Sequence, residues 1–421
     1  MNAFDGHASS SIDSPRKRLL IIAMAPVGEP LSVYKKRGGL SGGDRILIEL
    51  LKKWQVLFST SILTWEGGEY IIRHLYGIND SRFLELNVAL GQKLGDVALY
   101  AHKIVAGVFA GLFKPFDAPD LIYSSSDFLP DILPAFLLKC RHSQSRWIAA
   151  FFLFCPSPFS PDFPYRGRNY YKGLVYYVSQ FFCKHLIKRF ADVVFVTSEP
   201  DVAFFVTKRR PRERVLVIQG GVDVETSLKV GPQPLVYDAL FIGRFHPQKG
   251  VLELIDIWSE FVRMKKDARL AIIGYGYLEG EMKALAEKRG VLASLTFFGF
   301  LDGVEKIRVM KSAKMVLHPA TYDSGGMAAC EAFACGLPGV SFDLPALRTY
   351  YPRGMLKTPC FDKTAFAKNM YALLTDTDLF ERMKSDAIDL SHTVWDWRVR
   401  SHRITEVLLP LLESRSGDIP T

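Results

Sequence analysis

Short apolar runs alternate with segments of helical periodicity along most of the chain. In the first part, an apolar run at residues 19–25 precedes a helical pattern at 44–54, and a second apolar run follows at 55–60. This alternation is typical of parallel strands that are joined by helices. We therefore predict a mainly parallel α/β sheet in the first part of the chain.

A second series of apolar runs indicates a second sheet. These runs are separated by helical patterns and lie at residues 239–243, 270–274, 296–299, 315–318 and 339–342. Residues 220–238 contain glycines and two prolines without apolar periodicity, so we predict a linker at about 223–236. The fold class is α/β, with two Rossmann-like domains at 19–222 and 237–394.

The two ends of the chain differ from these domains. Residues 1–18 are polar and contain acids, without an apolar core segment, so we expect a disordered leader rather than a signal peptide. Residues 395–421 contain a helical pattern followed by a tail. This helix either crosses back to the first domain or packs only on its own domain.

Composition and cysteine usage place the protein among globular intracellular chains. Of its 421 residues, 48% are hydrophobic and 23% are charged, which is enough for two cores. Six cysteines without a C-x-x-C pair indicate no disulfide scaffold, so we expect a cytoplasmic protein. No apolar stretch reaches the roughly 20 residues of a spanning helix, so we predict no transmembrane segment.

Positive charge suggests an anionic partner. The formal net charge is +9, with basic clusters at residues 16–18, 35–37, 52–53 and 208–210. No zinc-finger spacing, RNP-like motif or basic zipper accompanies these clusters, so we do not expect nucleic-acid binding. A membrane surface or a phosphorylated substrate is the alternative partner, and a merely solvated basic surface is also consistent with the clusters.

Residues 320–341 carry the most specific pattern. Asp323 precedes the turn Ser324-Gly325-Gly326, a helical run begins near Met327, and Glu331 lies within that run. A helix N-terminus preceded by glycines offers free backbone N–H groups to an anion, so a diphosphate would fit there. The alternative is an ordinary capped turn before a buried helix.

Residues 241–250 place two cations just before another predicted helix. A positive side chain near a helix N-terminus opposes the helix dipole by about 0.3–1 kcal/mol. Arg244 and Lys249 therefore make most sense if an anion lies between them, although a solvated charged loop would also fit.

Two further glycine pairs follow predicted strands. Gly274 and Gly276 end a strand in the second half, where open α/β sheets bind ligands. Without a third spaced glycine they form a poor NAD fingerprint. Gly42 and Gly43 follow the pair at 38–39 on a predicted loop between the first strand and the first helix.

These segments together resemble the retaining GT-B glycosyltransferases of family four, also called glycosyl transferases group 1. That family has a loop of the form G-R-x-x-x-x-K-G and a segment like E-G-x-G-x-x-x-x-E-A-x-A-x-G-x-P. Arg244, Lys249 and Gly250 match the first form, and Glu331 with its following residues matches the second. The resemblance implies a GT-B fold, in which the two domains face each other and the terminal helix crosses back.

The resemblance also implies catalytic and binding roles. Arg244 and Lys249 would hold the donor diphosphate, Asp323 would orient the donor sugar, and Glu331 would bind the donor ribose. The other implied donor contacts are Gly42, Gly43, Gly243, Gly274, Gly276, Gly299, Phe300, Ser324, Gly325, Gly326 and Met327. No metal and no cofactor is expected, because the nucleoside diphosphate sugar is a co-substrate.

Two positions depart from the family pattern. Asp323 stands where a glutamate is usual, which shortens its reach by one methylene. Many relatives also carry a histidine near the donor sugar, whereas Phe152 or Leu153 occupies that position here. This difference would suit an unusual donor, another supporting group or lost activity. We expect His318, at a strand end, to be a packed histidine rather than a catalyst.

The resemblance implies transfer of a hexose from a nucleoside diphosphate sugar to a glycan or lipid-linked acceptor, with retention of configuration. Synthesis of cell-surface polysaccharide or glycolipid is the expected context. A sugar-nucleotide epimerase of the same fold and a non-catalytic nucleotide-sugar-binding scaffold are the alternatives, and product analysis separates them.

One helical pattern suggests a membrane contact. Residues 169–190 combine aromatic and aliphatic residues at helical spacing with Lys172, Lys184, Lys188 and Arg189. Such a helix either lies peripherally on an anionic membrane or covers its own core.

Overall fold

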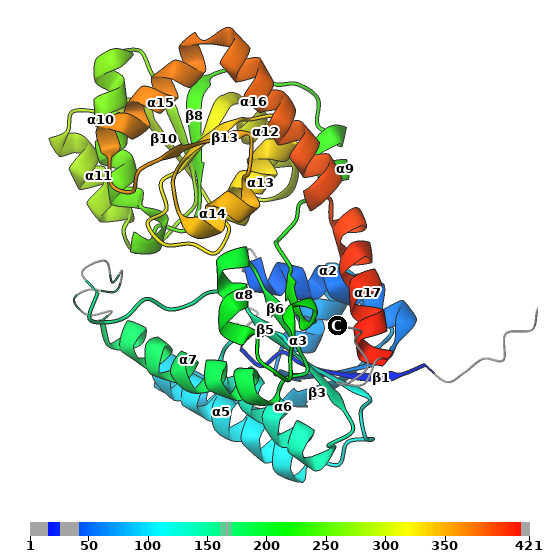
Figure 1. The fold of residues 1–421 in the computed structure, drawn as a ribbon. Coiled ribbons are helices and arrows are strands. Elements are labelled where there is room, and N and C mark those ends of the chain that lie inside the picture. Colours follow the sequence, from blue (N-terminus) through cyan, green and yellow to red (C-terminus); the bar gives the residue numbers. More distant parts are fainter. Residues whose placement is uncertain are drawn as a thin grey trace, which may run out of the picture.

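Two parallel sheets form the framework of the protein (Figure 1). The computed structural model describes residues 16–25, 42–160, 163, 165, 167 and 170–413, except for the side chain of Asp96. Residues 1–15 of the predicted leader, the glycines at 38–39 and residues 414–421 of the predicted tail lie outside this part of the chain.

The first sheet has seven strands in the order β3-β2-β1-β4-β5-β6-β7. They are β1 (Arg18–Ile22), β2 (Ser59–Trp65), β3 (Ser81–Leu86), β4 (Leu121–Ser124), β5 (Arg146–Phe151), β6 (Val193–Val196) and β7 (Val215–Val217). The helices between them are α2 (Gly42–Leu57), α3 (Gly68–Tyr70), η1 (Ile71–Leu75), α4 (Ala89–Leu94), α5 (Asp96–Phe113), α6 (Leu129–Arg141), α7 (Tyr170–Phe190), α8 (Glu199–Phe205) and η3 (Arg212–Arg214).

The second sheet has six strands in the order β10-β9-β8-β11-β12-β13. They are β8 (Tyr237–Ile242), β9 (Leu270–Ile273), β10 (Leu295–Gly299), β11 (Ala313–His318), β12 (Gly339–Phe342) and β13 (Met355–Thr358). Its helices are α9 (Val224–Lys229), η4 (Pro247–Lys249), α10 (Val251–Met264), α11 (Glu279–Lys288), η5 (Leu292–Ser294), α12 (Gly303–Lys311), α13 (Met327–Ala334), α14 (Pro345–Tyr350), α15 (Lys363–Thr375), α16 (Thr377–Leu390) and η6 (Ser391–Trp395).

Each sheet is buried on both faces, which explains the continuous apolar runs. Along β1, Leu19 and Ile21 point into one hydrophobic cluster and Leu20 and Ile22 into another. This is the two-residue periodicity of a strand that is covered by helices on both sides. The first cluster includes side chains of α2, and the second includes side chains of α5, α6 and α7.

Two predicted elements of the first domain differ from the structure. The strand predicted at 55–60 is wrong at its start, because α2 continues to Leu57 and β2 begins at Ser59. Val56 is apolar but 60% exposed at the end of the helix, so the apolar run overlapped two elements. Gly42 and Gly43 were predicted on a loop, whereas they are the first residues of α2.

The last helix joins the two domains. Helix α17 (Trp397–Glu413) lies against α2 of the first domain, as Figure 1 shows. Ile404 and Leu408 belong to a core cluster of the first domain, and Trp54 donates a hydrogen bond through its indole N–H to Thr405 Oγ1 at 3.1 Å. The crossover predicted for the terminal helix is therefore confirmed.

The chain passes between the domains twice, at adjacent places. The segment predicted as the linker contains α9, whose first turn is capped by Asp223 through a bond from the Thr226 amide. Just before it, the amide of Val222 donates to the carbonyl of Trp395 at 2.7 Å, and the amide of Trp397 donates back to Val222 at 3.1 Å. The outgoing and returning segments are thus bonded to each other.

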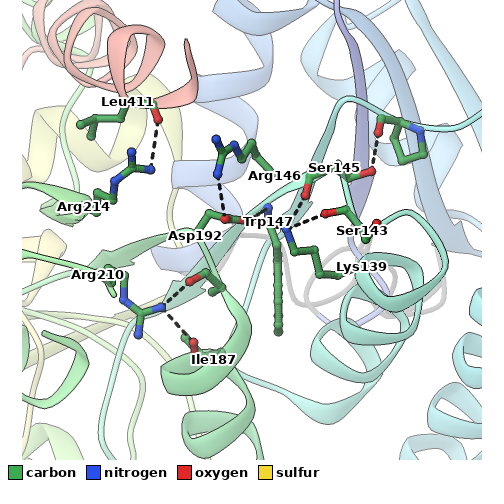
Figure 2. A network of polar contacts seen from close by, with 12 residues as sticks. Lys139, Ser143, Ser145, Arg146, Trp147, Ile187, Asp192, Arg210, Arg214 and Leu411 are labelled. Carbon is green, nitrogen blue, oxygen red and sulfur yellow. Dashed lines mark hydrogen bonds and ion pairs between the residues drawn. The ribbon is translucent and has the colours of Figure 1, made fainter. Parts of the chain in front are cut away.

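An ion-pair network supports the far side of the first domain (Figure 2). Asp192 accepts from Lys139 Nζ at 2.9 Å and from the Trp147 amide at 2.8 Å, and it pairs with Arg146 at 3.2 Å. Arg214 donates to the Leu411 carbonyl of α17 at 3.3 Å. Asp192 thus joins α6 to β5 and has a structural role, while Arg214 makes a separate contact with the crossover helix.

Candidate active site

The candidate site lies where the strand order of the second sheet reverses. Strand β8 has β9 on one side and β11 on the other, so the loops after β8 and β11 diverge. Such a switch point leaves a crevice at the carboxyl ends of the strands. Arg244 and Lys249 follow β8, and Asp323 follows β11, so the structure brings these three predicted residues to one crevice.

Lys249 and Asp323 form a buried ion pair. Lys249 Nζ lies 2.5 Å from Asp323 Oδ2, and the Asp323 side chain is only 6% exposed. The other carboxylate oxygen accepts from the Ser324 amide at 2.8 Å. Burial by itself would raise the pKa of Asp323, but Lys249 and His318 hold that pKa well below its usual range. Asp323 is therefore an anion that is already engaged on both oxygens.

His318 belongs to the same cluster. It is buried at the end of β11, and its Nε2 lies 3.2 Å from Asp323 Oδ2. Gly326 packs on the imidazole ring so closely that a Cβ there would lie 2.3 Å from His318 Cε1. Gly326 also has a φ of 62°, which favours glycine. The predicted packed histidine thus contacts the acid and the turn of the candidate site.

Glycines allow the strand-end loops to approach one another. A Cβ on Gly250 would lie 1.8 Å from the Pro319 carbonyl oxygen, which means that the start of α10 abuts the end of β11. The same holds for Gly274, where a Cβ would lie 1.9 Å from the Gly243 carbonyl oxygen. These close contacts place Lys249 within reach of Asp323.

Two helix N-termini meet at this crevice. Met327 is the first residue of α13, and its side chain packs against the core of the first domain. A Cβ on Gly42, the first residue of α2, would lie 3.1 Å from Met327 Sδ, and one on Gly220 would lie 2.3 Å from Met327 Cγ. Helix N-termini carry partial positive charge, so their meeting favours an anionic ligand.

A cavity with side chains from both domains opens beside Arg244. Its volume is about 360 Å³. It is lined by Tyr165, Lys172, Arg244, Phe245, His246, Tyr275, Gly276 and Tyr277. Burial, assisted by Arg244 and Lys249, lowers the pKa of His246 to about 4, so its imidazole is neutral at pH 7. The cavity therefore joins cationic groups and aromatic rings at the domain boundary.

Glu331 has a partner that the sequence patterns did not reveal. Its Oε1 accepts from Lys306 Nζ of α12 at 3.0 Å, and Lys306 also pairs with Asp302 at 3.2 Å. The side chain of Glu331 is still 35% exposed. The four-residue spacing of Asp302, just before α12, and Lys306 is a detectable signal of an ion pair, but it does not indicate Glu331 as a third member.

The predicted nucleobase position is aromatic. Phe300 is 41% exposed, and its ring lies 5.9 Å from the ring of Tyr275. Gly299 has a φ of 68° and accepts a hydrogen bond from the Gly274 amide at 2.8 Å. This turn joins the ends of β9 and β10 and presents two rings at the edge of the crevice.

Tyr322 of the second domain contacts the segment of the first domain where many family members carry a histidine. Phe152 is a buried core residue, and Thr197 donates to its carbonyl at 2.5 Å. Two residues further on, the carbonyl of Phe154 accepts a hydrogen bond from the Tyr322 hydroxyl. The residue before Asp323 is therefore a direct link between the domains, which sequence reasoning missed.

Two α/β domains with parallel sheets, a ligand crevice between them and a crossing terminal helix define the GT-B class of fold. The Anabaena protein HepE in complex with UDP and glucose aligns with a TM-score of 0.66 at 15% identity, over 93% of this chain and 99% of that one. Sucrose-phosphate synthase from Thermosynechococcus elongatus aligns at 0.64 with 16% identity, over 95% and 100%. The predicted fold class is confirmed.

Sequence comparisons match the second domain to a known family. Residues 231–389 match the profile described as glycosyl transferases group 1. Phosphatidyl-myo-inositol mannosyltransferase from Mycobacterium leprae is 31% identical over 199 residues, which are 45% of this chain and 52% of that protein. GDP-mannose:cellobiosyl-diphosphopolyprenol alpha-mannosyltransferase from Xanthomonas campestris is 27% identical over 154 residues, 36% and 40% of the two chains. The chain thus spans about half the length of the first relative and 40% of the second.

Proposed function

We propose that the protein transfers a hexose from a nucleoside diphosphate sugar to a glycan or lipid-linked acceptor, with retention of configuration. The observation that carries this proposal is the ion pair of Lys249 and Asp323 at the switch point of the second sheet. It lies beside the N-terminus of α13 and the exposed Arg244. Two cations and a helix N-terminus converge there, and this arrangement favours an anionic ligand.

In the proposed reaction, the protein lowers the barrier by stabilising the departing diphosphate. Charge grows on the leaving group as the bond to the sugar breaks, so fixed positive groups bind the transition state more tightly than the ground state. Arg244, Lys249 and the start of α13 supply those groups. Glu331, with one oxygen held by Lys306, presents its other oxygen to the donor ribose.

The structure suggests a more specific role for Asp323. Its carboxylate oxygens are engaged by Lys249 and by the Ser324 amide, and its side chain is almost fully buried. We therefore assign Asp323 as a positioning residue that fixes the ammonium group of Lys249 for the diphosphate. Orientation of the sugar by Asp323, which the family resemblance implies, stays a prediction.

The relatives support a donor with a nucleoside diphosphate and an acceptor in surface glycolipid or polysaccharide synthesis. The Mycobacterium leprae relative is described as a phosphatidyl-myo-inositol mannosyltransferase, and the Xanthomonas campestris relative as acting with a diphosphopolyprenol. Both names combine mannosyl transfer with a lipid. On these grounds we place the protein in the same class of reaction and assign it no particular base or sugar.

Thermal unfolding with UDP, GDP, ADP and NAD in parallel tests the proposal. A ligand at 100 times its dissociation constant adds about 2.7 kcal/mol to the free energy of unfolding. We expect one nucleoside diphosphate to stabilise the protein and NAD to have no effect. Loss of the shift in Arg244→Ala would locate the site, and incubation of donor without acceptor would expose epimerisation. No shift with any nucleotide would contradict the proposal and favour a scaffold.

A further inference from the structure

The solvent side of α7 is mostly apolar between Tyr170 and Phe182. Phe182 is 56% exposed, Tyr171 49% and Val178 46%. With Leu174 and Val175 these side chains recur at intervals of three and four residues, so they share one face of the helix. None of them contributes to the buried clusters of the first domain.

The buried side of α7 is less apolar than its exposed side. It consists of Gly173, Ser179, Gln180, Cys183 and Ile187. Gln180 accepts from the Cys155 amide at 2.6 Å and donates to Asp127 at 2.7 Å, so part of this interior is a polar network. A helix that only covers a protein core has the opposite arrangement. The apolar exposed side therefore requires another explanation.

Helix α5 has the same character and lies beside α7. Val97, Val105 and Phe109 are 51%, 65% and 62% exposed, again at helical spacing. The ring of Phe128 contacts both Tyr100 of α5 and Tyr176 of α7, and Figure 1 shows the two helices side by side. We define the apolar helical face as Val97, Val105, Phe109, Leu112 and Phe113 of α5 with Tyr170, Tyr171, Leu174, Val175, Val178, Phe181 and Phe182 of α7.

The charges on α7 are positive. The sequence of α7 contains no Asp or Glu, whereas it contains Lys172, Lys184, Lys188 and Arg189. A large exposed apolar patch marks an interaction surface, and a basic rim fits an anionic partner better than a second copy with the same charges. No helix in the described part of the chain is long and apolar enough to span a membrane.

We propose that the apolar helical face docks on an anionic membrane surface, with α5 and α7 lying in the interface. Apolar side chains would enter the boundary between head groups and acyl chains, and the basic rim would contact lipid phosphates. This arrangement uses every unusual feature of the two helices. It extends the expected membrane contact of residues 169–190 to a surface made by two helices.

The same surface leads to the candidate active site. Lys172, in the first turn of α7, lines the cavity beside Arg244, and Tyr171 and Leu174 flank it on the apolar helical face. A lipid-linked acceptor in the docked membrane would therefore present its polar head next to the donor crevice. This part of the inference rests on the proposed function and selects a lipid-linked acceptor over a soluble glycan.

Vesicle flotation tests the docking. We expect the protein to float with vesicles of phosphatidylcholine mixed with phosphatidylglycerol, more weakly with phosphatidylcholine alone, and less at high salt. The variants V178E/F182E in α7 and V105E/F109E in α5 should weaken binding at least about tenfold. Each variant replaces apolar side chains that would transfer from water into the membrane with charged ones. Lys188→Gln with Arg189→Gln should weaken binding to the anionic vesicles about fivefold per residue.

A matched control separates the face from general surface charge. Tyr371 and Val407 are 42% and 52% exposed outside the face, so Y371E/V407E adds the same charge to comparable apolar sites. This control should bind vesicles as the parent protein does. Equal binding by the face variants would overturn the proposal. So would sedimentation data showing that the parent forms a dimer that the face variants disrupt, without vesicle binding.

The reaction gives an independent result. With the donor found by thermal unfolding, the parent protein should glycosylate a lipid extract presented in anionic vesicles and leave soluble oligosaccharides unmodified. The face variants should lose this reaction while keeping their nucleotide-induced thermal shift. Transfer only to soluble glycans would overturn the acceptor assignment. Vesicle binding without any rise in unfolding temperature on nucleotide addition would instead contradict the proposed function and still support the docking surface.

Discussion

Asp131 and Asp323 occupy corresponding places in the two sheets, yet the fold raises the pKa of the first and lowers the pKa of the second. Asp131 follows β4 and accepts from the amide of Met24, in the loop after β1, at 2.7 Å. Asp323 follows β11 and binds Lys249 in the loop after β8. Each acid therefore bridges the switch point of its own sheet.

The partners of the two acids explain the difference. Burial raises the pKa of Asp131 to about 7, because the Ser126 hydroxyl, the backbone amides that bind it and the charge of Lys103 offset only part of that effect. At Asp323 the same effect of burial is outweighed by Lys249 and His318, so its pKa is low. Burial alone does not determine whether an acid is charged, because a nearby positive group can outweigh the cost of burial. At the first switch point the acid binds backbone amides, and at the second it binds a charged side chain.

The largest expected effect is on the pH dependence of stability at Asp131. An acid whose folded pKa is raised keeps its proton when the unfolded chain has lost it, so stability falls as pH rises from about 4 to about 7. Asp131→Asn should remove this slope, and at higher pH the difference from the parent should reach about 4 kcal/mol. Urea unfolding of both proteins across this range measures it. Parallel curves would show that Asp131 stays ionised.

The same substitution at the second switch point should act differently. Asp323→Asn leaves the ammonium group of Lys249 without its buried partner, which should cost about 3 kcal/mol of unfolding free energy. The pKa of Asp323 is lowered by folding, so its contribution is complete above the usual carboxylate range and is lost only as pH falls below that range. We thus expect a constant loss between pH 5 and pH 8 by urea unfolding. A loss that changes with pH in that interval would contradict the assigned charge.

The third prediction concerns turnover. Arg244→Ala and Lys249→Ala should each lower the rate of sugar transfer roughly 100-fold or more, because each removes positive charge from the departing diphosphate. Arg244 is exposed, so its variant should unfold at the parent temperature. Asp131→Asn serves as the control and should transfer sugar at nearly the parent rate. Near-normal rates in both alanine variants would refute the assigned roles.

For the second domain, the sequence predicted the positions of the strands better than the contacts between the residues of the candidate site. Apolar runs located the strands, with β12 placed at Gly339–Phe342 as observed, because buried parallel strands leave a continuous signal. The same reasoning placed Arg244, Lys249 and Asp323 at strand ends. Which groups pair there depends on contacts between loops distant in sequence, such as Lys249 with Asp323 or Lys306 with Glu331. Local periodicity contains no information on those contacts.

The first domain shows the same limit in another form. Gly42 and Gly43 were recognised as unusual, but a glycine-rich stretch does not tell where a helix begins, and α2 includes both. The helical pattern of residues 169–190 left two orientations open, because its apolar and polar residues are mixed around the helix. The structure adds that Gln180 is buried and Phe182 is exposed, and the membrane contact stays a proposal.

The paired crossing of the chain at Val222 and Trp395 makes the second domain an insertion in the first. Its first and last residues lie side by side, since Val222 is bonded to both Trp395 and Trp397. Segments whose ends meet in this way can be transplanted or circularly permuted without rethreading the rest of the chain. The second domain should therefore be exchangeable as a single unit, with α17 left in place to complete the first domain.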